Sequence, residues 1–311
     1  MRSPLPRQTW LTLAQTAGIG LIFYFIITHI ARHAYQLQEI RFQWRAGALL
    51  LSVILKMIYS VNLTLIWWYI TKKNHCPLPA ARSTVYWVLS MAGKYIPSKV
   101  FLYAGRLYFY KKEDRPAAQV TFSLYLEIFC AMLAAVFVYL LSTLIVTIDV
   151  LEPFKPMIFL SLLVLMIIIH PKFSGPLMNW ILRLTGKTKI PVTMNYYEIL
   201  SVTFLYMLNY AFLGLALFFF IRSFYPLSAN QIPYITGANA LAGVLGMLAF
   251  FTPSGLGVRD GVLAFTLAAI LPGAVAGLIA LTTRLWLSVI DLILFALALM
   301  AAKIKRMPIG I

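Results

Sequence analysis

Acidic residues are scarce in this chain of 311 residues, which holds 9 Asp and Glu against 26 Lys and Arg and has a formal net charge of +17. Charged residues of either sign make up only 11% of the sequence, whereas 61% is apolar, and the mean hydropathy is +0.85. These values lie far outside those of soluble domains, which need a polar surface. We therefore expect no soluble catalytic module and predict an all-α polytopic membrane protein.

Two cysteines and four histidines leave little material for metal or nucleophilic chemistry. Cys76 lies in a loop and Cys130 inside an apolar run, so we expect neither a disulfide nor a metal site. No Ser/His/Asp arrangement and no pair of catalytic carboxylates is apparent. Gly186-Lys187-Thr188 is similar to the end of a phosphate-binding loop, but Ile181 stands where that loop requires a glycine. We therefore expect no catalytic residue, no cofactor and no enzymatic activity.

The basic residues concentrate in short segments between apolar runs. Placing both termini in the cytoplasm gives 15 Lys and Arg to the cytoplasmic segments and 5 to the outer loops. This asymmetry follows the positive-inside rule, so the excess charge indicates contact with anionic lipid headgroups rather than with nucleic acid. The cytoplasmic segments are 1–8, 71–82, 110–116, 171–194 and 303–311, and the outer loops are 31–45, 149–156 and 222–231.

The apolar runs divide into full spans and two interrupted segments. Runs that cross the membrane without a break predict about six spans, at 10–30, 46–70, 117–148, 157–170, 195–221 and 274–302. Each interrupted segment has two shorter arms, which predicts a broken or re-entrant helical hairpin. The arms of the first hairpin are 83–96 and 98–110, and those of the second are 232–251 and 258–271. Leu177–Leu184 is typical of an amphipathic helix at the interface.

The two interruptions have related sequences. The first is Gly93-Lys94-Tyr95-Ile96-Pro97-Ser98-Lys99, and the second contains Pro253-Ser254-Gly255-Leu256-Gly257-Val258-Arg259-Asp260. Proline cannot donate a backbone hydrogen bond and glycine permits unusual backbone angles, so helices should break there. The residues expected to make the breaks are Gly93, Pro97, Pro253, Gly255 and Gly257. Paired interruptions in the two halves of a membrane protein indicate a binding site near the middle of the membrane.

The order of elements suggests an internal repeat. We expect one transmembrane domain over 1–311 with no soluble domain, divided into half-repeats 1–148 and 149–311. Each half reads span, span, hairpin, span, and the second half begins on the other side of the membrane. The two halves are therefore predicted to form an inverted repeat in which the hairpins meet near the midplane.

Nine charged residues lie inside the apolar segments, where a charge costs roughly 2.5–3.5 kcal/mol unless it faces a cavity or another charge. The bases outnumber the acids, which predicts a cationic cavity for a phosphate-bearing headgroup. The candidate substrate-binding residues are Lys94, Arg106, Glu127, Arg259, Asp260 and Arg284. In the empty site we expect the two acids of this set to pair with cations. The alternative is that these charges form internal ion pairs that hold the helices together, an interpretation with most weight for Lys56 and Asp291. Lys99 can instead extend its ammonium group to the membrane interface.

These motifs, in order, resemble a known family. Gly93–Pro97, Gly105-Arg106, Glu127, Pro253–Asp260 and Arg284 together are similar to the flippase-like membrane region of lysylphosphatidylglycerol synthases, over essentially the whole chain. The resemblance implies a stand-alone, multi-pass member of this uncharacterised membrane protein family, in the bacterial cytoplasmic (inner) membrane. The aminoacyl-transferase domain is absent, so the chain should not make the lipid, and Asp260 stands where the family more often has Glu. The substrate therefore does not carry over.

Three functions fit the sequence. We expect a translocator of an anionic or phosphate-bearing lipid, of phospholipid or polyprenyl-phosphate type, between leaflets. An enzyme or accessory subunit acting on lipid-linked sugars is the second reading; it predicts a strictly required carboxylate and product formation in vitro. A non-transporting partner of a separate lipid synthase or glycosyltransferase is the third; it predicts co-purification with that enzyme and no transport in liposomes.

Overall fold

The computed structural model of the chain describes residue 28 and residues 44–95, 100–146, 152–153, 155–169, 176, 195–249, 252 and 255–307. Within these residues the regular structure is helical and includes no β-strand, so the predicted all-α class is confirmed. Several predictions concern segments outside the described residues, namely the first span at 10–30, the interfacial segment 177–184, and Pro97, Lys99 and Pro253.

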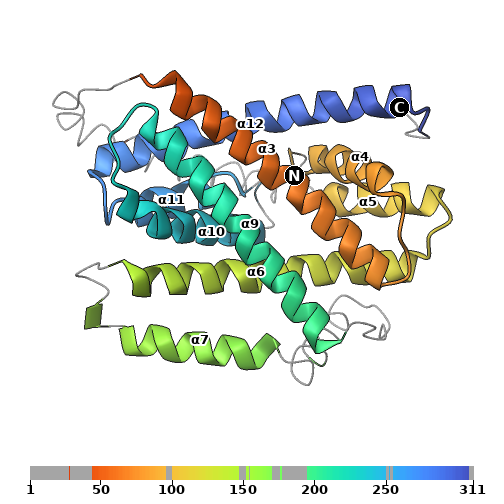
Figure 1. Ribbon diagram of the computed structural model, residues 1–311, viewed down its shortest axis with the longest axis horizontal. Helices are drawn as coiled ribbons and strands as arrows, with labels where there is room; N and C mark the ends of the chain where they lie inside the picture. Colours follow the sequence, from red (N-terminus) through yellow and green to blue (C-terminus); the bar gives the residue numbers. More distant parts are fainter. Residues whose placement is uncertain are drawn as a thin grey trace, which may run out of the picture.

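Four helices are long and apolar enough to cross a membrane: α3 (Ala46–Lys73), α6 (Ala117–Ile145), α9 (Tyr196–Arg222) and α12 (Gly273–Ile304) (Figure 1). The shortest, α9, has 27 residues. A helix of that length rises about 40 Å, which exceeds the roughly 30 Å hydrocarbon core of a bilayer. Large apolar side chains on these helices point outward, as Leu285 of α12 does with 70% of its surface exposed. Such surfaces are stable in lipid and indicate a membrane protein.

Local sequence signals set the starts of these helices. α6 and α12 follow Pro116 and Pro272, because a residue that precedes proline is kept out of the helical conformation. α9 begins with a capping box, in which the Asn195 backbone N–H donates to Glu198 Oε2 at 2.9 Å. The four observed starts therefore lie within one residue of the predicted starts at 46, 117, 195 and 274.

The segment predicted as a full span at 157–170 forms the shorter helix α7 (Lys155–Ile169). Its 15 residues rise only about 22 Å, less than a bilayer core. α7 packs against α6 and α9, and Met157 and Leu160 on its outer side are 64% and 59% exposed. The described residues thus include four helices long and apolar enough to cross a membrane and this shorter apolar helix, where the sequence predicts about six full spans in the whole chain.

The first predicted hairpin is present as two short helices side by side. α4 (Ala80–Met91) continues into the 3-10 turn η1 (Ala92–Tyr95), and α5 (Val100–Lys112) packs against both. The two arms approach so closely that a Cβ atom on Gly93 would lie 2.5 Å from the backbone nitrogen of Leu102. Only glycine permits this approach without a shift of the backbone, which explains its place in the break.

The second hairpin consists of α10 (Ile232–Leu248) and α11 (Val258–Leu267), which also pack together. Gly255 and Gly257 have φ angles of 68° and 81°, in the left-handed region that favours glycine. A Cβ atom on Gly255 would also lie 2.6 Å from the carbonyl oxygen of Gly246 in α10. Both glycines thus adopt the unusual backbone angles that the sequence analysis expects of them.

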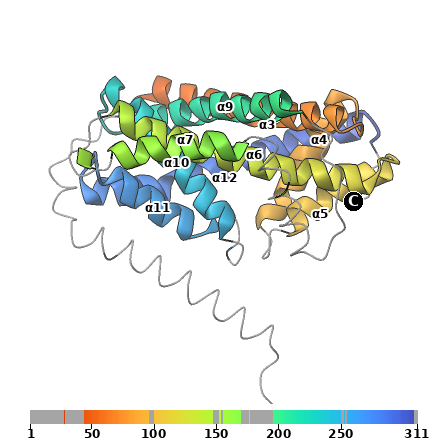
Figure 2. The ribbon, with the colours of Figure 1, turned by 90° about the horizontal axis from the view of Figure 1, so that it is seen from below.

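The long helices and the two hairpins pack against one another (Figures 1 and 2). α3 and α9 run antiparallel. The Arg45 N–H at the start of α3 donates to Ser223 O beyond the end of α9, at 2.8 Å. At the other end, Lys73 Nζ pairs with Glu198 Oε1 at 2.7 Å. α4 packs against α12, and α10 packs against α6, so each hairpin rests on a long helix of the other half. Described residues of both hairpins border a common space.

Candidate functional site

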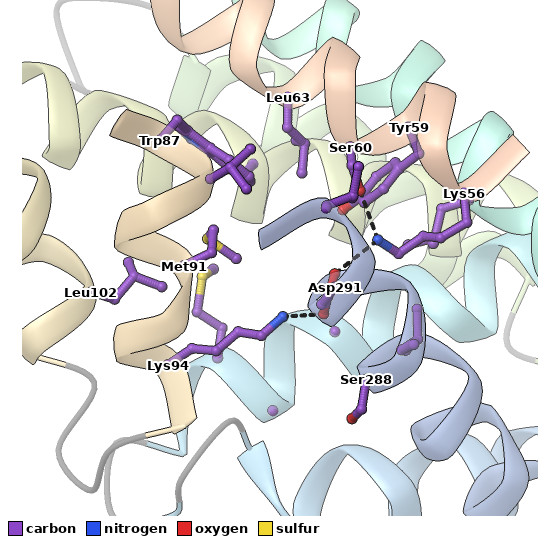
Figure 3. A pocket seen from close by; sticks show the side chains of 18 of the residues that line it. Lys56, Tyr59, Ser60, Leu63, Trp87, Met91, Lys94, Leu102, Ser288 and Asp291 are labelled. Atoms are coloured by element: carbon purple, nitrogen blue, oxygen red, sulfur yellow. Dashed lines mark hydrogen bonds and ion pairs between the residues drawn. The ribbon is translucent and has the colours of Figure 1, made fainter. Parts of the chain in front are cut away.

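A cavity of about 640 Å³ lies between the two hairpins. The first hairpin contributes the end of α4 and η1, including Met91 and Lys94, and the second contributes Gly246, Met247 and Arg259. All four long helices complete the wall. Most of the lining is apolar, and the charged side chains are set into it (Figure 3). Two hairpins that are far apart in sequence therefore contribute to one site.

One carboxylate in this cavity binds two lysines from different elements. Asp291 of α12 accepts from Lys56 of α3, with 3.3 Å between Oδ1 and Nζ, and its Oδ2 pairs with Nζ of Lys94 from η1 (Figure 3). Lys56 Nζ also donates to Ser60 Oγ at 2.7 Å. The Asp291 side chain is 20% exposed. This cluster links η1 of the first hairpin to α3 and α12, and it carries one net positive charge.

Arg106 and Glu127 form a second, enclosed ion pair. Arg106 Nη1 donates to Glu127 Oε2, and Arg106 Nε donates to Ser90 Oγ at 3.3 Å. The guanidinium lies between two indole rings, 4.6 Å from the centroid of Trp67 and 5.1 Å from that of Trp87. Trp87 Nε1 also donates to Glu127 Oε1, at 3.0 Å. With only 1% of its side chain exposed, Arg106 already has the partners that a buried guanidinium needs.

Arg284 and Asp260 form a third pair at the start of α11. Arg284 Nη1 lies 3.0 Å from Asp260 Oδ2, which also accepts from the backbone N–H of Gly257 at 3.1 Å. A carboxylate in the first turn stabilises the helix by bonding an otherwise unpaired N–H. Asp260 does not line the cavity and its side chain is 1% exposed, whereas that of Arg284 lines it and is 17% exposed.

Arg259 differs from the other cationic residues of the cavity. It lies in the first turn of α11, and Nη2 donates to the amide oxygen of Asn239 in α10 at 3.2 Å. No carboxylate among the described residues lies within 4.0 Å of its guanidinium. Asn239 is 2% exposed, and its Nδ2 has no hydrogen-bond partner. An unneutralised guanidinium and an unpartnered amide N–H₂ thus sit together on the cavity wall.

The described charges do not balance. Five basic residues line the cavity, namely Lys56, Lys94, Arg106, Arg259 and Arg284. Two acids, Glu127 and Asp291, line it, and Asp260 lies behind Arg284. The surplus is therefore two positive charges in a largely apolar cavity, where the effective dielectric constant is lower than in water and an anion is attracted more strongly.

The structure brings the predicted site residues together. Five of the six line one cavity, and the sixth, Asp260, binds one of them. The expected pairing of Glu127 and Asp260 with arginines is confirmed. Sequence reasoning left Lys56 and Asp291 out of the candidate site, although both lie inside predicted spans. It also missed neutral lining groups, because a tyrosine inside a span gives no signal of the face it occupies; these are Tyr59, Tyr206, Tyr210 and Ser288.

No model of a known protein family matches the chain, and no curated protein matches it. The resemblance to the membrane region of lysylphosphatidylglycerol synthases therefore stays a prediction. Among the described residues no group of three His, Cys, Asp or Glu side chains is placed to hold a metal ion.

Proposed function

We propose that this protein is a membrane lipid translocator that binds a phosphate-bearing headgroup in the cavity between the two hairpins. One observation carries this proposal: the cavity has a surplus of two positive charges, and Arg259, just after the second break, has no carboxylate partner among the described residues. A guanidinium binds phosphate oxygens through two parallel hydrogen bonds, and the ammonium groups of Lys56 and Lys94 add point charges. The largely apolar remainder of the wall suits the first carbons of a lipid.

The position of the charges along the helices supports a site inside the membrane. Lys56 lies ten residues after the start of α3 and Arg284 eleven residues after the start of α12. At 1.5 Å per residue, each is about 15 Å from the end of its helix, which is half the thickness of a hydrocarbon core. Charges at that depth are expensive unless they serve a cavity or a pathway. A headgroup bound there is midway between the leaflets.

The contacts between elements also fit an inverted repeat. If α3, the first hairpin and α6 are equivalent to α9, the second hairpin and α12, then exchanging the halves converts the α4–α12 contact into the α10–α6 contact. Both contacts occur, and the equivalent helices α3 and α9 run antiparallel. Such pseudo-symmetry allows a protein to present one central site to either side of the membrane by equivalent motions.

The test is lipid transfer in liposomes. The purified protein is reconstituted with a trace of fluorescent phosphatidylglycerol, and dithionite bleaches the label in the outer leaflet. We expect the wild type to expose nearly all of the label and protein-free vesicles about half. The variant Arg259→Gln should slow transfer about 10- to 100-fold, because a charge-assisted hydrogen bond contributes about 1.5–3 kcal/mol.

Lys303→Gln is the matched control, since Lys303 is an exposed base in the last turn of α12, away from the cavity lining. It should transfer lipid at the wild-type rate. Equal rates for wild type and Arg259→Gln would reject the cavity as the route. Selective lipid retention without any transfer would favour the non-transporting partner of a lipid synthase.

A further inference from the structure

We infer that the cavity selects lipids whose headgroup combines phosphate with neutral hydroxyl groups, as glycerol or a sugar does, and that it rejects headgroups carrying an ammonium group. This inference rests on the proposed function and names the substrate class of the same site. It depends on two observations: the cavity has no free carboxylate among its described residues, and it has neutral polar groups without partners.

The carboxylates of the chain can be accounted for one by one. The chain has nine acids, and three of them are bound to bases of the cavity, namely Glu127, Asp260 and Asp291. Three more pair with bases elsewhere and do not line the cavity: Glu113, Glu152 and Glu198. Asp114 lies in the turn after α5. The other two, Glu39 and Asp149, are outside the described residues and belong to the predicted loops 31–45 and 149–156.

An ammonium group entering this cavity would find no unpaired carboxylate among the described lining residues. To bind Asp291 it would have to displace Lys56 or Lys94, and to bind Glu127 it would have to displace Arg106 from between two indole rings. Either exchange leaves a base unpaired in a low-dielectric enclosure and adds a further positive charge to the surplus of two. Removing one partner from a buried ion pair is strongly unfavourable, so the cavity discriminates against cationic and zwitterionic headgroups by repulsion.

Two neutral groups in the wall lack hydrogen-bond partners. Tyr206 of α9 is 2% exposed and its hydroxyl is unpartnered, and the Nδ2 of Asn239 in α10 is likewise unpartnered. Both residues line the cavity. A buried donor left unpaired destabilises the protein, so such groups indicate a ligand that can bond to them. A hydroxyl both donates and accepts, and therefore suits the phenol as well as the amide.

The cavity is complementary to an unmodified anionic lipid or to a lipid-linked sugar phosphate. The shared chemistry is a phosphate next to hydroxyl groups.

The test is competition among lipids with the same acyl chains, read by native mass spectrometry of the full-length protein. Equimolar dimyristoyl phosphatidylglycerol, phosphatidylethanol, phosphatidylethanolamine and lysylphosphatidylglycerol are added to delipidated protein in detergent. We expect phosphatidylglycerol to be retained at least about tenfold over the two ammonium lipids and about threefold over phosphatidylethanol, which is anionic but has no hydroxyl group. The variant Tyr206→Phe should remove most of the preference over phosphatidylethanol.

The outcomes separate the two proposals. Equal retention of all four lipids would reject the anion-binding cavity and with it the proposed function. A different result would overturn this inference alone: both anionic lipids are preferred over phosphatidylethanolamine, but lysylphosphatidylglycerol is retained to the same extent as phosphatidylglycerol. Equal retention of phosphatidylglycerol and phosphatidylethanol would overturn the role assigned to hydroxyl groups.

A change of charge should alter the selectivity in a defined direction. In Lys56→Gln/Lys94→Gln, Asp291 loses both partners, and we expect the preference for phosphatidylglycerol over lysylphosphatidylglycerol to fall at least about tenfold. If that variant does not fold, Ser288→Asp adds a carboxylate to the lining of α12 without removing a pair, and Ser288→Asn is its uncharged control. The Asp variant should lower the preference and the Asn variant should keep it; equal preferences in both would contradict the inference.

Discussion

The cavity arginines have different roles, although the sequence presents them alike. Arg106 is enclosed by an ion pair, a hydroxyl and two indole rings, so its partners are within the protein. Arg259 bonds only to a neutral amide oxygen among the described residues. The first is expected to act mainly in stability and the second mainly in ligand binding, which divides the predicted site into a supporting part and a binding part.

This division predicts unequal effects on folding. Arg106→Ala should lower the free energy of unfolding by about 3–5 kcal/mol, because Glu127 is left charged and buried without a partner. Arg106→Leu/Glu127→Leu should recover much of that loss, since both charges are then absent. Arg259→Gln leaves no carboxylate unpaired and should change stability by less than about 1 kcal/mol. Denaturant unfolding in detergent measures all three, and a loss in Arg259→Gln as large as that in Arg106→Ala would contradict the division.

Cys76 lies in the loop after α3. The side chain is fully buried, and burial raises the pKa of its thiol to about 11. Because the folded-state pKa lies above the ordinary value of 9.0, the thiol contributes stability at neutral pH that is lost as the pH rises toward 11. We expect slow reaction with maleimide at pH 7 and faster reaction as the pH rises above 9 or after denaturation. Cys76→Ser supplies the background, and rapid labelling of folded protein at pH 7 would contradict this burial.

At the scale of elements, the hairpins depend on close backbone packing. In the first hairpin, Gly93→Ala would place a Cβ atom 2.5 Å from the Leu102 nitrogen, whereas Gly105→Ala places one at an ordinary 3.8 Å from Ser90. We expect the first variant to lower the melting temperature in detergent by several degrees, equivalent to about 1–3 kcal/mol, and the second to leave it nearly unchanged. Equal melting temperatures would show that the arms can separate at little cost.

The second hairpin offers the same comparison with a backbone component added. Gly255→Ala combines a φ of 68° with a Cβ atom 2.6 Å from Gly246 O, whereas a Cβ atom on Gly243 meets nothing within 4 Å. Gly255→Ala should therefore lose more stability than Gly243→Ala, by about 1–2 kcal/mol from the left-handed conformation alone. Thermal unfolding of the two variants compares them directly, and a Gly255→Ala protein as stable as Gly243→Ala would mean that the break can rearrange.

These elements were predictable because their signals are local. Proline marks the starts of α6 and α12, and glycine marks both breaks, so the observed arms of the first hairpin lie within three residues of those predicted. The pairing of charges was not predictable in the same way. Asp291 binds lysines 235 and 197 residues away in the sequence, and nothing in a single sequence records which distant helices meet. Hence the charged residues were identified, but Asp291 was not assigned to the site.

Neutral polar residues show the same limit. Asn209 makes a hydrogen bond between helices, because its Nδ2 donates to the Tyr59 carbonyl in α3 at 3.2 Å. Asn239 also lies in an apolar segment, but its Oδ1 accepts from Arg259 on the cavity wall. The two asparagines have similar apolar neighbours in the sequence. Only the packing of α10 against α11 separates the structural residue from the candidate binding residue.

At the scale of the whole molecule, the proposal depends on the two hairpins entering from opposite sides. The packing of α4 on α12 and of α10 on α6 is what such an inverted arrangement requires. If it is correct, the base of the first hairpin near Lys112 faces the cytoplasm, and the base of the second near Asn230 faces outward. A parallel arrangement would place both bases on one side of the membrane.

Single cysteines at these two positions test the topology. In a Cys76→Ser/Cys130→Ala background, Asn230→Cys should react with a membrane-impermeant maleimide in intact cells, and Lys112→Cys should react only after the cells are opened. Both positions are exposed, so accessibility to the reagent depends on the side of the membrane and not on burial. Lys303→Cys, in the last turn of α12, should behave like Lys112→Cys, because both termini are placed in the cytoplasm. Labelling of both hairpin bases from one side would exclude the inverted repeat, and a central site served by equivalent motions of the two halves would then lose its structural basis.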